Sequence, residues 1–432
     1  GQAFTINPET VAGAIVPAGI TYSWSAPTVT GGITGGTAGT GETSIGGTLV
    51  NPTNTAQTAT YTVNIVSPES VCQGDAFVIA ITVNPKPYVD ASQSATICSG
   101  ASFSVIPTDG GGNSIPANTT YTWTIPVINP AGSITGGTAQ NSPQTAISQA
   151  LNNTTSDVAT ATYTVTPTSG NCAGETFEII VTVNPVPTVD DIAAQTLCGG
   201  SPTDAITFTG ATGGTVYSWT NNTPSIGLAT SGVGNIPPFI AVNSGTAPVT
   251  ATITVTPVYA GCPGAAKTFT ITVNPAPTVS FSQATQSICS GTASTSVTLS
   301  SATMGASISW TAVQPAGLTG VTTSGTNTIP AQTLANTTSS PITVTYTAVA
   351  ATSDASACPG PLAIYTIVVN PVPFVGAPIA EAICSGGTVT VTPPDGGSNN
   401  IPAGTTFTWT APTGTGFTGG TAQPAPQPSF SQ

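Results

Sequence analysis

The sequence predicts an all-β protein built of tandem antiparallel β-sandwich domains, arranged as beads on a string. Three observations lead to this prediction. Five tryptophans recur at intervals of 91 to 99 residues, apolar and polar residues alternate with a period of two inside each interval, and no stretch of ten or more residues keeps a helical period. Alternation with a period of two is typical of strands that have one buried face and one exposed face.

The tryptophans mark one strand of each domain. Each closes a short pattern with a large apolar residue two positions earlier, as in Tyr121-Thr-Trp123 and Phe407-Thr-Trp409. One buried tryptophan in a sandwich of seven strands is typical of the immunoglobulin fold, in which it lies on strand C. The predicted core tryptophans are Trp24, Trp123, Trp219, Trp310 and Trp409.

The motif Asn-Pro-x-Pro marks the end of each domain. It follows a strand-like segment such as Val181-Thr-Val183, and proline cannot join a β-ladder. We therefore expect it to end the last strand and to form a short, semi-rigid hinge between domains, although a turn inside one domain is an alternative. The predicted hinge prolines are Pro85, Pro87, Pro185, Pro187, Pro275, Pro277, Pro371 and Pro373.

These markers divide the chain into five repeats of about the size of one β-sandwich domain. Neither end of the sequence falls on a boundary between repeats, so we expect it to be a piece of a longer chain. The first repeat lacks its first strand and the fifth lacks its last strands. The predicted repeats are residues 1–86, 87–186, 187–276, 277–372 and 373–432.

The composition excludes many functions. Only 4% of the residues are charged: there are two Lys+Arg and 15 Asp+Glu, no histidine, and a formal net charge of −13. Without histidine there is no Ser-His-Asp or Cys-His arrangement, and two cations cannot neutralise enough phosphates to bind nucleic acid. Because the apolar runs are too short to span a bilayer, we also expect no direct membrane insertion.

Carboxylates are the remaining candidates for chemistry, and they are poorly placed. Asp190 and Asp191 are adjacent, so they would face opposite sides of a strand. Asp90 and Glu381 add one carboxylate each at other junctions, which is too few for a calcium site. We therefore expect a protein that is not an enzyme and has no catalytic residue, no metal and no cofactor.

The eight cysteines predict disulfides and an oxidising compartment, because their number is even and their placement regular. Two pairings remain open. The preferred scheme crosses each hinge, because a chain that folds back there would bring the two cysteines together: Cys72–Cys98, Cys172–Cys198, Cys262–Cys289 and Cys358–Cys384. The alternative lies within a repeat, where the cysteines would stand at opposite poles of the sandwich: Cys98–Cys172, Cys198–Cys262 and Cys289–Cys358.

The recurring motifs resemble a known group of repeats. Ile97-Cys-Ser-Gly100, Tyr121-Thr-Trp123 and Val181-Thr-Val-Asn-Pro-x-Pro187 are similar to the PKD-like and immunoglobulin-like tandem repeats of giant Bacteroidota cell-surface proteins. That group includes gliding-motility adhesins exported by the type IX secretion route. The resemblance implies a location that is extracellular or on the outer cell surface, and it implies no catalytic residues.

Two functions follow as hypotheses. The first is an extracellular structural or adhesive stalk or filament, which self-associates into a fibre or binds a surface ligand such as a glycan or another cell-surface protein. Partial repeats at both ends would allow a neighbour to donate the strands that complete them. The alternative is a carbohydrate-binding accessory array of an exported enzyme, which needs exposed aromatic platforms that an aromatic content of 6% supplies sparingly.

Overall fold

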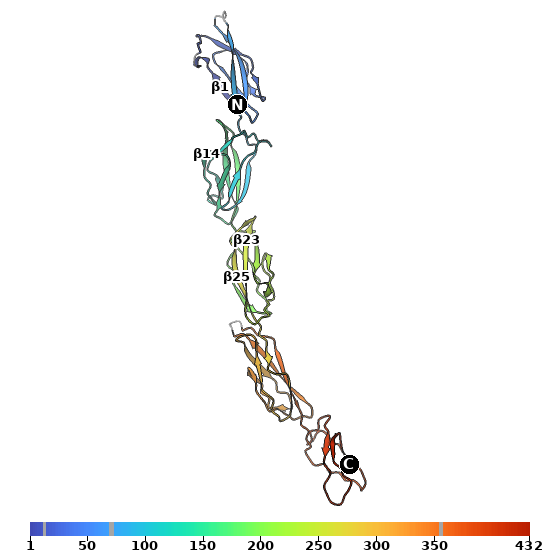
Figure 1. Cartoon of the computed structure of the whole chain (residues 1–432). Coiled ribbons are helices and arrows are strands. Elements are labelled where there is room, and N and C mark those ends of the chain that lie inside the picture. The colour runs from blue at the N-terminus through green and yellow to red at the C-terminus, as the bar shows by residue number, and fades with distance from the viewer. Residues whose placement is uncertain (12–13, 69–72, 354–356) are drawn as a thin grey trace. The chain divides into compact units, whose positions relative to one another are not determined.

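The computed structural model describes residues 1–432 except 12–13, 69–72 and 354–356 (Figure 1). The prediction of an all-β protein is confirmed. The helical segments of the described residues are two short 3-10 turns, η1 (Pro8–Thr10) and η2 (Pro224–Ile226). By internal contacts the chain forms two compact units. The first comprises residues 1–190, 208–218 and 256–267, and the second comprises residues 191–207, 219–255 and 268–432.

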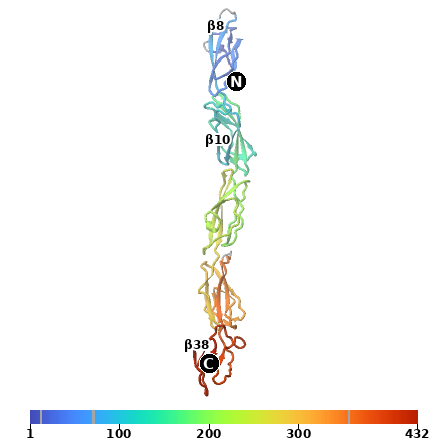
Figure 2. The same cartoon turned by 90° about the vertical axis from the view of Figure 1, so that its right-hand side faces the viewer.

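The first repeat packs two sheets around Trp24, Ile45 and Tyr61. One sheet has the strand order β1-β6-β4, and the other has the order β3-β7-β2-β5, with β8 paired to β7. Figure 2 labels β8 in this repeat. The strands are β1 (Gln2–Ile6), β2 (Thr21–Trp24), β3 (Thr28–Val29), β4 (Thr34–Gly35), β5 (Gly39–Glu42), β6 (Ile45–Val50), β7 (Gln57–Val66) and β8 (Gln73–Val83).

The second repeat has the same plan around Trp123, Ile147 and Tyr163. Its large sheet has the order β14-β11-β17-β19-β9, with β12 and β18 also on β17, and two short pairs, β10-β15 and β13-β16, lie apart from it. The strands are β9 (Gln93–Cys98), β10 (Ser102–Val105), β11 (Thr120–Trp123), β12 (Val127–Asn129), β13 (Ile134–Thr135), β14 (Gln140–Gln144), β15 (Ile147–Ala150), β16 (Asn152–Asn153), β17 (Ala159–Ser169), β18 (Cys172–Ala173) and β19 (Phe177–Asn184).

The third and fourth repeats follow the second. In the fourth, a sheet of order β27-β35-β34-β29-β31 covers a core around Trp310 and Tyr346. The strands of the third repeat are β20 (Gln195–Cys198), β21 (Val216–Asn221), β22 (Ser231–Val233), β23 (Val249–Tyr259), β24 (Cys262–Pro263) and β25 (Lys267–Asn274). Those of the fourth are β26 (Ser280–Phe281), β27 (Gln286–Cys289), β28 (Val297–Ser300), β29 (Ser307–Ala312), β30 (Leu318–Thr319), β31 (Ser324–Thr326), β32 (Thr328–Ile329), β33 (Ala335–Asn336), β34 (Ile342–Ala351) and β35 (Ala363–Asn370).

The fifth repeat contains short strands only. Two antiparallel pairs, β36-β39 and β37-β38, make up its regular structure, and Trp409 packs against Phe430 with ring centroids 4.8 Å apart. The strands are β36 (Thr390–Val391), β37 (Phe407–Trp409), β38 (Gln423–Gln427) and β39 (Phe430–Ser431).

One strand pair in each of three repeats is parallel, whereas the sequence predicted antiparallel sheets throughout. The first strand of the repeat lies along the last one: β9 along β19, β20 along β25, and β27 along β35. The chain therefore does not fold back at Asn-Pro-x-Pro. The chain instead continues along the next repeat as the first strand of that repeat. This strand ends at a cysteine, which lies beside the start of the following Asn-Pro-x-Pro motif.

Candidate functional site: the disulfide-linked junctions

The last two long strands of a repeat are joined by a hairpin that contains Cys-x-Gly. In the second repeat β17 turns through Gly170, and β18 then pairs Cys172 with Ser169. The glycine of this motif donates its N–H to the carbonyl of the preceding long strand in all three complete repeats. These bonds are Gly174 to Pro167 at 2.7 Å, Gly264 to Pro257 at 2.8 Å and Gly360 to Ala350 at 2.7 Å.

The same glycine allows the hairpin to lie directly on the hinge motif. A Cβ at Gly264 would collide with the carbonyl oxygen of Pro187, which is the second proline of Asn-Pro-x-Pro. Gly174 and Gly360 stand in the same relation to Pro87 and Pro277. A larger residue would therefore push the hairpin, and the cysteine two positions before the glycine, away from the motif.

The first strand brings a second cysteine to the other end of each repeat. Cys98 lies opposite Asn184, Cys198 opposite Asn274, and Cys289 opposite Asn370. The residue after each cysteine then donates its N–H to the carbonyl of that asparagine: Ser99 to Asn184 at 2.9 Å, Gly199 to Asn274 at 2.9 Å, and Ser290 to Asn370 at 2.8 Å.

Two disulfides join these two features across successive repeats. Cys98 of the second repeat bonds to Cys262 in the hairpin of the third, with a Cα–Cα separation of 5.5 Å. Cys198 of the third repeat bonds to Cys358 in the hairpin of the fourth, at 5.4 Å. Both separations lie in the usual range for disulfides. Each bond therefore ties the end of one repeat to the beginning of the next.

For these four cysteines, both pairings that the sequence suggested are wrong. The preferred scheme, with Cys72–Cys98, Cys172–Cys198, Cys262–Cys289 and Cys358–Cys384, required the chain to fold back at the hinge. The parallel first strand instead carries each of its cysteines to the far end of its own repeat. The same geometry argues against the alternative pairs Cys98–Cys172, Cys198–Cys262 and Cys289–Cys358. The two cysteines of each of these pairs lie at opposite ends of the last long strand of their repeat.

The other cysteines are not disulfide-bonded in the described structure. Cys172 is half-buried, and Cys289 and Cys384 are exposed thiols. Cys72 lies outside the described residues.

One recurring asparagine holds the loop before the long hairpin against the end of the last strand. The Asn336 side chain donates to Val369 O at 2.9 Å and to Ser340 O at 2.8 Å, and its Oδ1 accepts from Thr338 N–H at 2.8 Å. Asn51, Asn153 and Asn243 make the corresponding bonds to Val83, Val183 and Val273. This asparagine is not among the residues predicted from the sequence, although its recurrence 31 to 34 positions before Asn-Pro-x-Pro is a usable signal.

The predicted core tryptophans lie where expected in four repeats. Trp24, Trp123, Trp219 and Trp310 are buried, and Trp409 is half-buried. Opposite Trp310 on β31 stands Gly325, and a Cβ there would lie 2.5 Å from the indole Cζ2 atom. Glycine at this position makes room for the ring.

The predicted hinge prolines are mostly buried. Both prolines of the first three motifs are enclosed, whereas Pro371 is half-buried and Pro373 is exposed. Directly after the first motif the chain packs onto the second repeat, because Tyr88 N–H donates to Ser114 O at 2.8 Å and Val89 lies in the core. That these prolines form hinges between domains stays a prediction.

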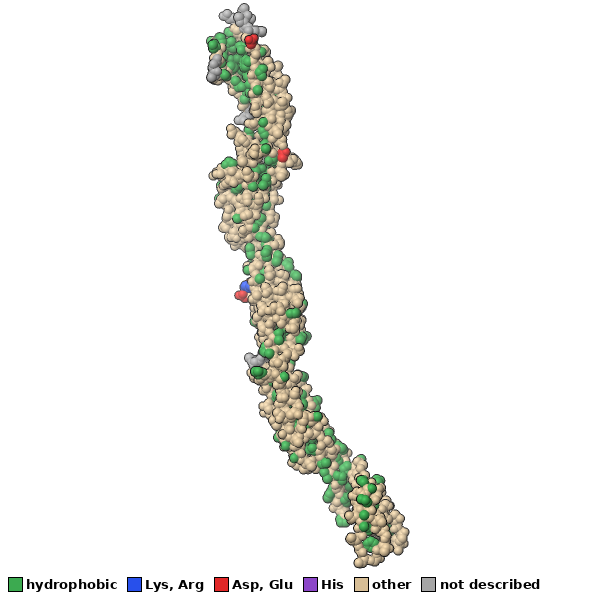
Figure 3. Space-filling view, in the orientation of Figure 1, with side chains coloured by type: hydrophobic (Ala, Val, Ile, Leu, Met, Phe, Trp, Pro, Cys, Tyr) green, Lys and Arg blue, Asp and Glu red, His purple; other side chains and the backbone are tan. Residues whose placement is uncertain are grey.

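Charged side chains are sparse at the junctions, as on the face drawn in Figure 3. Lys86 Nζ lies 2.5 Å from Glu175 Oε1, and this ammonium group lowers the pKa of the Glu175 carboxyl. Asp90 accepts from the Tyr88 hydroxyl, and Asp190 accepts from the Thr209 hydroxyl. Across the residues that the structure describes, no three His, Cys, Asp or Glu side chains gather as metal ligands would.

Among the described residues, no helix has the length and apolar character that crossing a bilayer requires.

A family model for the PKD-like domain matches residues 6–87, 95–187 and 286–373. No curated protein matches the sequence.

The solved structures that match include protocadherin gamma B2 cadherin domains 1–5, with 14% identity over 73% of this chain and 65% of that one, and a TM-score of 0.26. The chain thus spans less than two thirds of that fragment. Mouse cadherin-23 EC22-24 has 13% identity over 66% and 98% of the two chains, with a TM-score of 0.28. Sidekick-1 immunoglobulin domains 1–4 have 11% identity over 86% and 94%, with a TM-score of 0.24.

Proposed function

Because this chain belongs to the PKD-like domain family, we propose that it is a non-enzymatic structural or adhesive protein outside the cell. In this proposal it forms part of a stalk or filament of tandem repeats on the surface of a bacterium of the Bacteroidota type. Its partners are further copies of itself or a surface ligand, such as a glycan or another cell-surface protein.

The disulfides between repeats carry this proposal. A bond such as Cys98–Cys262 does not close a loop inside one domain; it fastens one domain to its neighbour. The second bond, Cys198–Cys358, repeats the arrangement one repeat further along. Linking successive domains by covalent bonds serves a protein that must bear tension or keep its domains in order, and it contributes nothing to binding a small molecule.

The same bonds favour an extracellular location. Disulfides persist in oxidising compartments and are rare in the reducing cytosol. The scarcity of lysine and the absence of arginine also leave very few sites for trypsin-like proteases, which helps a protein to survive outside the cell.

Two measurements on the native producer test the proposal together. An antibody raised against residues 1–432 is expected to label intact cells. Peptide mapping of the surface material without reduction is expected to recover Cys98 joined to Cys262, and Cys198 joined to Cys358. Labelling that requires permeabilised cells, together with free thiols at these four positions, would contradict both the location and the function.

A further inference from the structure

We propose that the open edge of β8, together with Cys172, is a binding site for one added β-strand that ends in Ile-Cys-Ser. The cysteine of this strand forms a disulfide with Cys172. The proposal rests on the geometry of the junctions and does not depend on where the protein is located.

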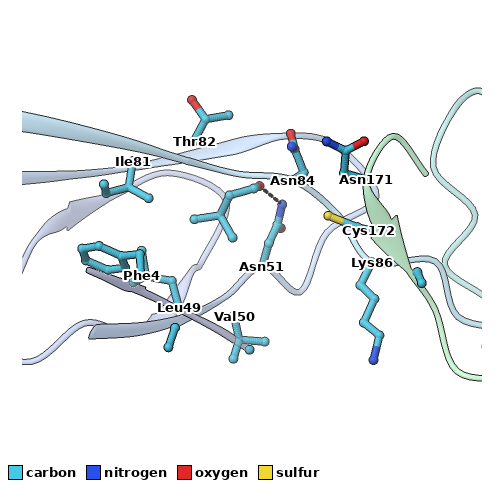
Figure 4. A pocket seen from close by; sticks show the side chains of 14 residues that line it. Phe4, Leu49, Val50, Asn51, Ile81, Thr82, Asn84, Lys86, Asn171 and Cys172 are labelled. Carbon is cyan, nitrogen blue, oxygen red and sulfur yellow. Dashed lines mark hydrogen bonds between the residues drawn. The ribbon is translucent and has the colours of Figure 1, made fainter. Parts of the chain in front are cut away.

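The site is a cavity of about 440 Å³ between the first repeat and the hairpin of the second. Phe4, Leu49, Ile81 and Val83 supply its apolar wall, and Asn84 and Cys172 lie at its end. Figure 4 shows the Cys172 side chain directed from β18 toward Asn84 and Asn51. A strand that follows the edge of β8 would therefore arrive at the Cys172 sulfur.

The last strand of the first repeat is less covered than its equivalents. Ile179, Val181 and Val183 of β19 are 0% exposed, because β9 lies along that strand. In the first repeat, Ile81 and Val83 of β8 are only half-buried, although they pack against the core in the same way. An added strand would bury them as β9 buries the residues of β19.

The backbone groups that hold such a strand are also present. In the second repeat, Ser99 donates its N–H to Asn184 O at 2.9 Å, and its hydroxyl accepts from Asn153 N–H at 2.9 Å. The fourth repeat repeats both bonds with Ser290, Asn370 and Asn336. Asn84 and Asn51 occupy these two positions in the first repeat, which explains why the strand should end in Cys-Ser.

Cys172 differs from its equivalents in the hairpins of the third and fourth repeats. Cys262 and Cys358 are 1% and 0% exposed, and each is bonded to the cysteine at the end of a first strand. Cys172 occupies the same hairpin position but is half-buried and unbonded. By the register of β9 on β19, the added cysteine would lie opposite Asn84 and the isoleucine before it opposite Val83.

The probe is a synthetic peptide with the sequence Gln286–Ser290, Gln-Ser-Ile-Cys-Ser, supplied as its mixed disulfide with glutathione. The Cys172 thiolate attacks the peptide sulfur, the bond to glutathione breaks, and glutathione leaves as the thiolate, so that no further oxidant is needed. Burial of the isoleucine predicts modification of Cys172 about tenfold faster than of Cys289 or Cys384. Those two exposed thiols of the same chain report intrinsic reactivity.

A scrambled peptide, Ser-Cys-Gln-Ile-Ser, and the Cys172→Ser variant are the controls. Modification of Cys172 by both peptides at the same rate, or modification that follows exposure alone and favours Cys289 and Cys384, would overturn the proposal. Residues Glu381–Ser385 of this chain have the same sequence type, so a Cys172–Cys384 crosslink between two copies would support it.

A second variant tests the site even if the free peptide binds too weakly to react faster at Cys172. Gln-Ser-Ile-Cys-Ser is fused directly before Gly1, which stands at the position of Gly291 in the fourth repeat. Oxidised glutathione is supplied, so that the new cysteine first carries glutathione as a mixed disulfide; the Cys172 thiolate then attacks the sulfur of the new cysteine and glutathione leaves as the thiolate. We expect this bond to form and the amides of residues 79–84 to exchange more slowly with solvent. Substituting aspartate for the added isoleucine should prevent both effects. A fused strand that leaves Cys172 free and these amides unprotected would refute the site.

Discussion

The two disulfides are expected to limit how far the chain can be stretched. Cys98 and Cys358 are 260 positions apart, so the reduced and unfolded segment between them extends about 900 Å at about 3.5 Å per residue. In the oxidised protein the shortest covalent path crosses from Cys98 to Cys262, returns along the chain to Cys198, and crosses to Cys358. Only 64 positions are then stretched, or about 220 Å.

Single-molecule force spectroscopy on the chain, held at both termini, measures this difference. Adding a reductant is expected to lengthen the fully unfolded molecule by about 700 Å. The Cys198→Ser variant is the matched control, because it keeps Cys98–Cys262 and leaves the 96 positions from Cys262 to Cys358 free to extend by about 340 Å. Equal extension of the reduced and oxidised chains would refute the connectivity on which the proposed function rests.

Three substitutions test the packing that supports the junctions, each followed by denaturant unfolding or non-reducing mapping. Gly325→Ala places a Cβ against Trp310 and should destabilise the fourth repeat by about 1–3 kcal/mol. Gly213→Ala is the control, because a Cβ there meets no neighbouring atom, and it should leave the unfolding midpoint unchanged. Equal unfolding midpoints for the two variants would contradict this prediction. Asn336→Ala leaves the buried carbonyl of Val369 without this donor and should cost about 1–3 kcal/mol, while an unchanged midpoint would contradict a stabilising role for this asparagine. Gly264→Ala forces the hairpin away from Pro187 and should lower the yield of the Cys98–Cys262 bond without affecting Cys198–Cys358; an equal fall in both would indicate general misfolding instead.

The all-β fold and its core could be predicted because they depend on local patterns. Alternation along β17 places Ala161, Tyr163 and Val165 on one face, and all three are buried in the structure. Tryptophan recurs on the same strand of each repeat, such as β11, which lies between β14 and β17, so its spacing indicated the length of the repeat. The alternation and the recurrence of one residue type can both be recognised in a single sequence.

The disulfides could not be predicted because they depend on which strands become neighbours. The alternation of residues 93–98 is equally compatible with an antiparallel and a parallel partner. Because β9 pairs with β19 in the parallel direction, Cys98 lies at the far end of its repeat. The glycine of Cys262-Pro-Gly264 and the asparagine at position 336 recur in the sequence. Their structural roles depend on the carbonyl groups that they contact in the folded chain.

The spacing of the paired cysteines has a consequence for the whole array. The two bonds close loops of 164 and 160 residues, each longer than the interval of 91 to 99 residues between successive tryptophans. Neighbouring loops must therefore overlap, and the segment from Cys198 to Cys262 belongs to both. In the chain-entropy model each loop contributes about 5 kcal/mol to the folded state. Because of this overlap, tension in the oxidised chain passes through the Cys98–Cys262 bond, back along the chain to Cys198, and out through the Cys198–Cys358 bond. The other residues between Cys98 and Cys358 are shielded from tension while both bonds remain.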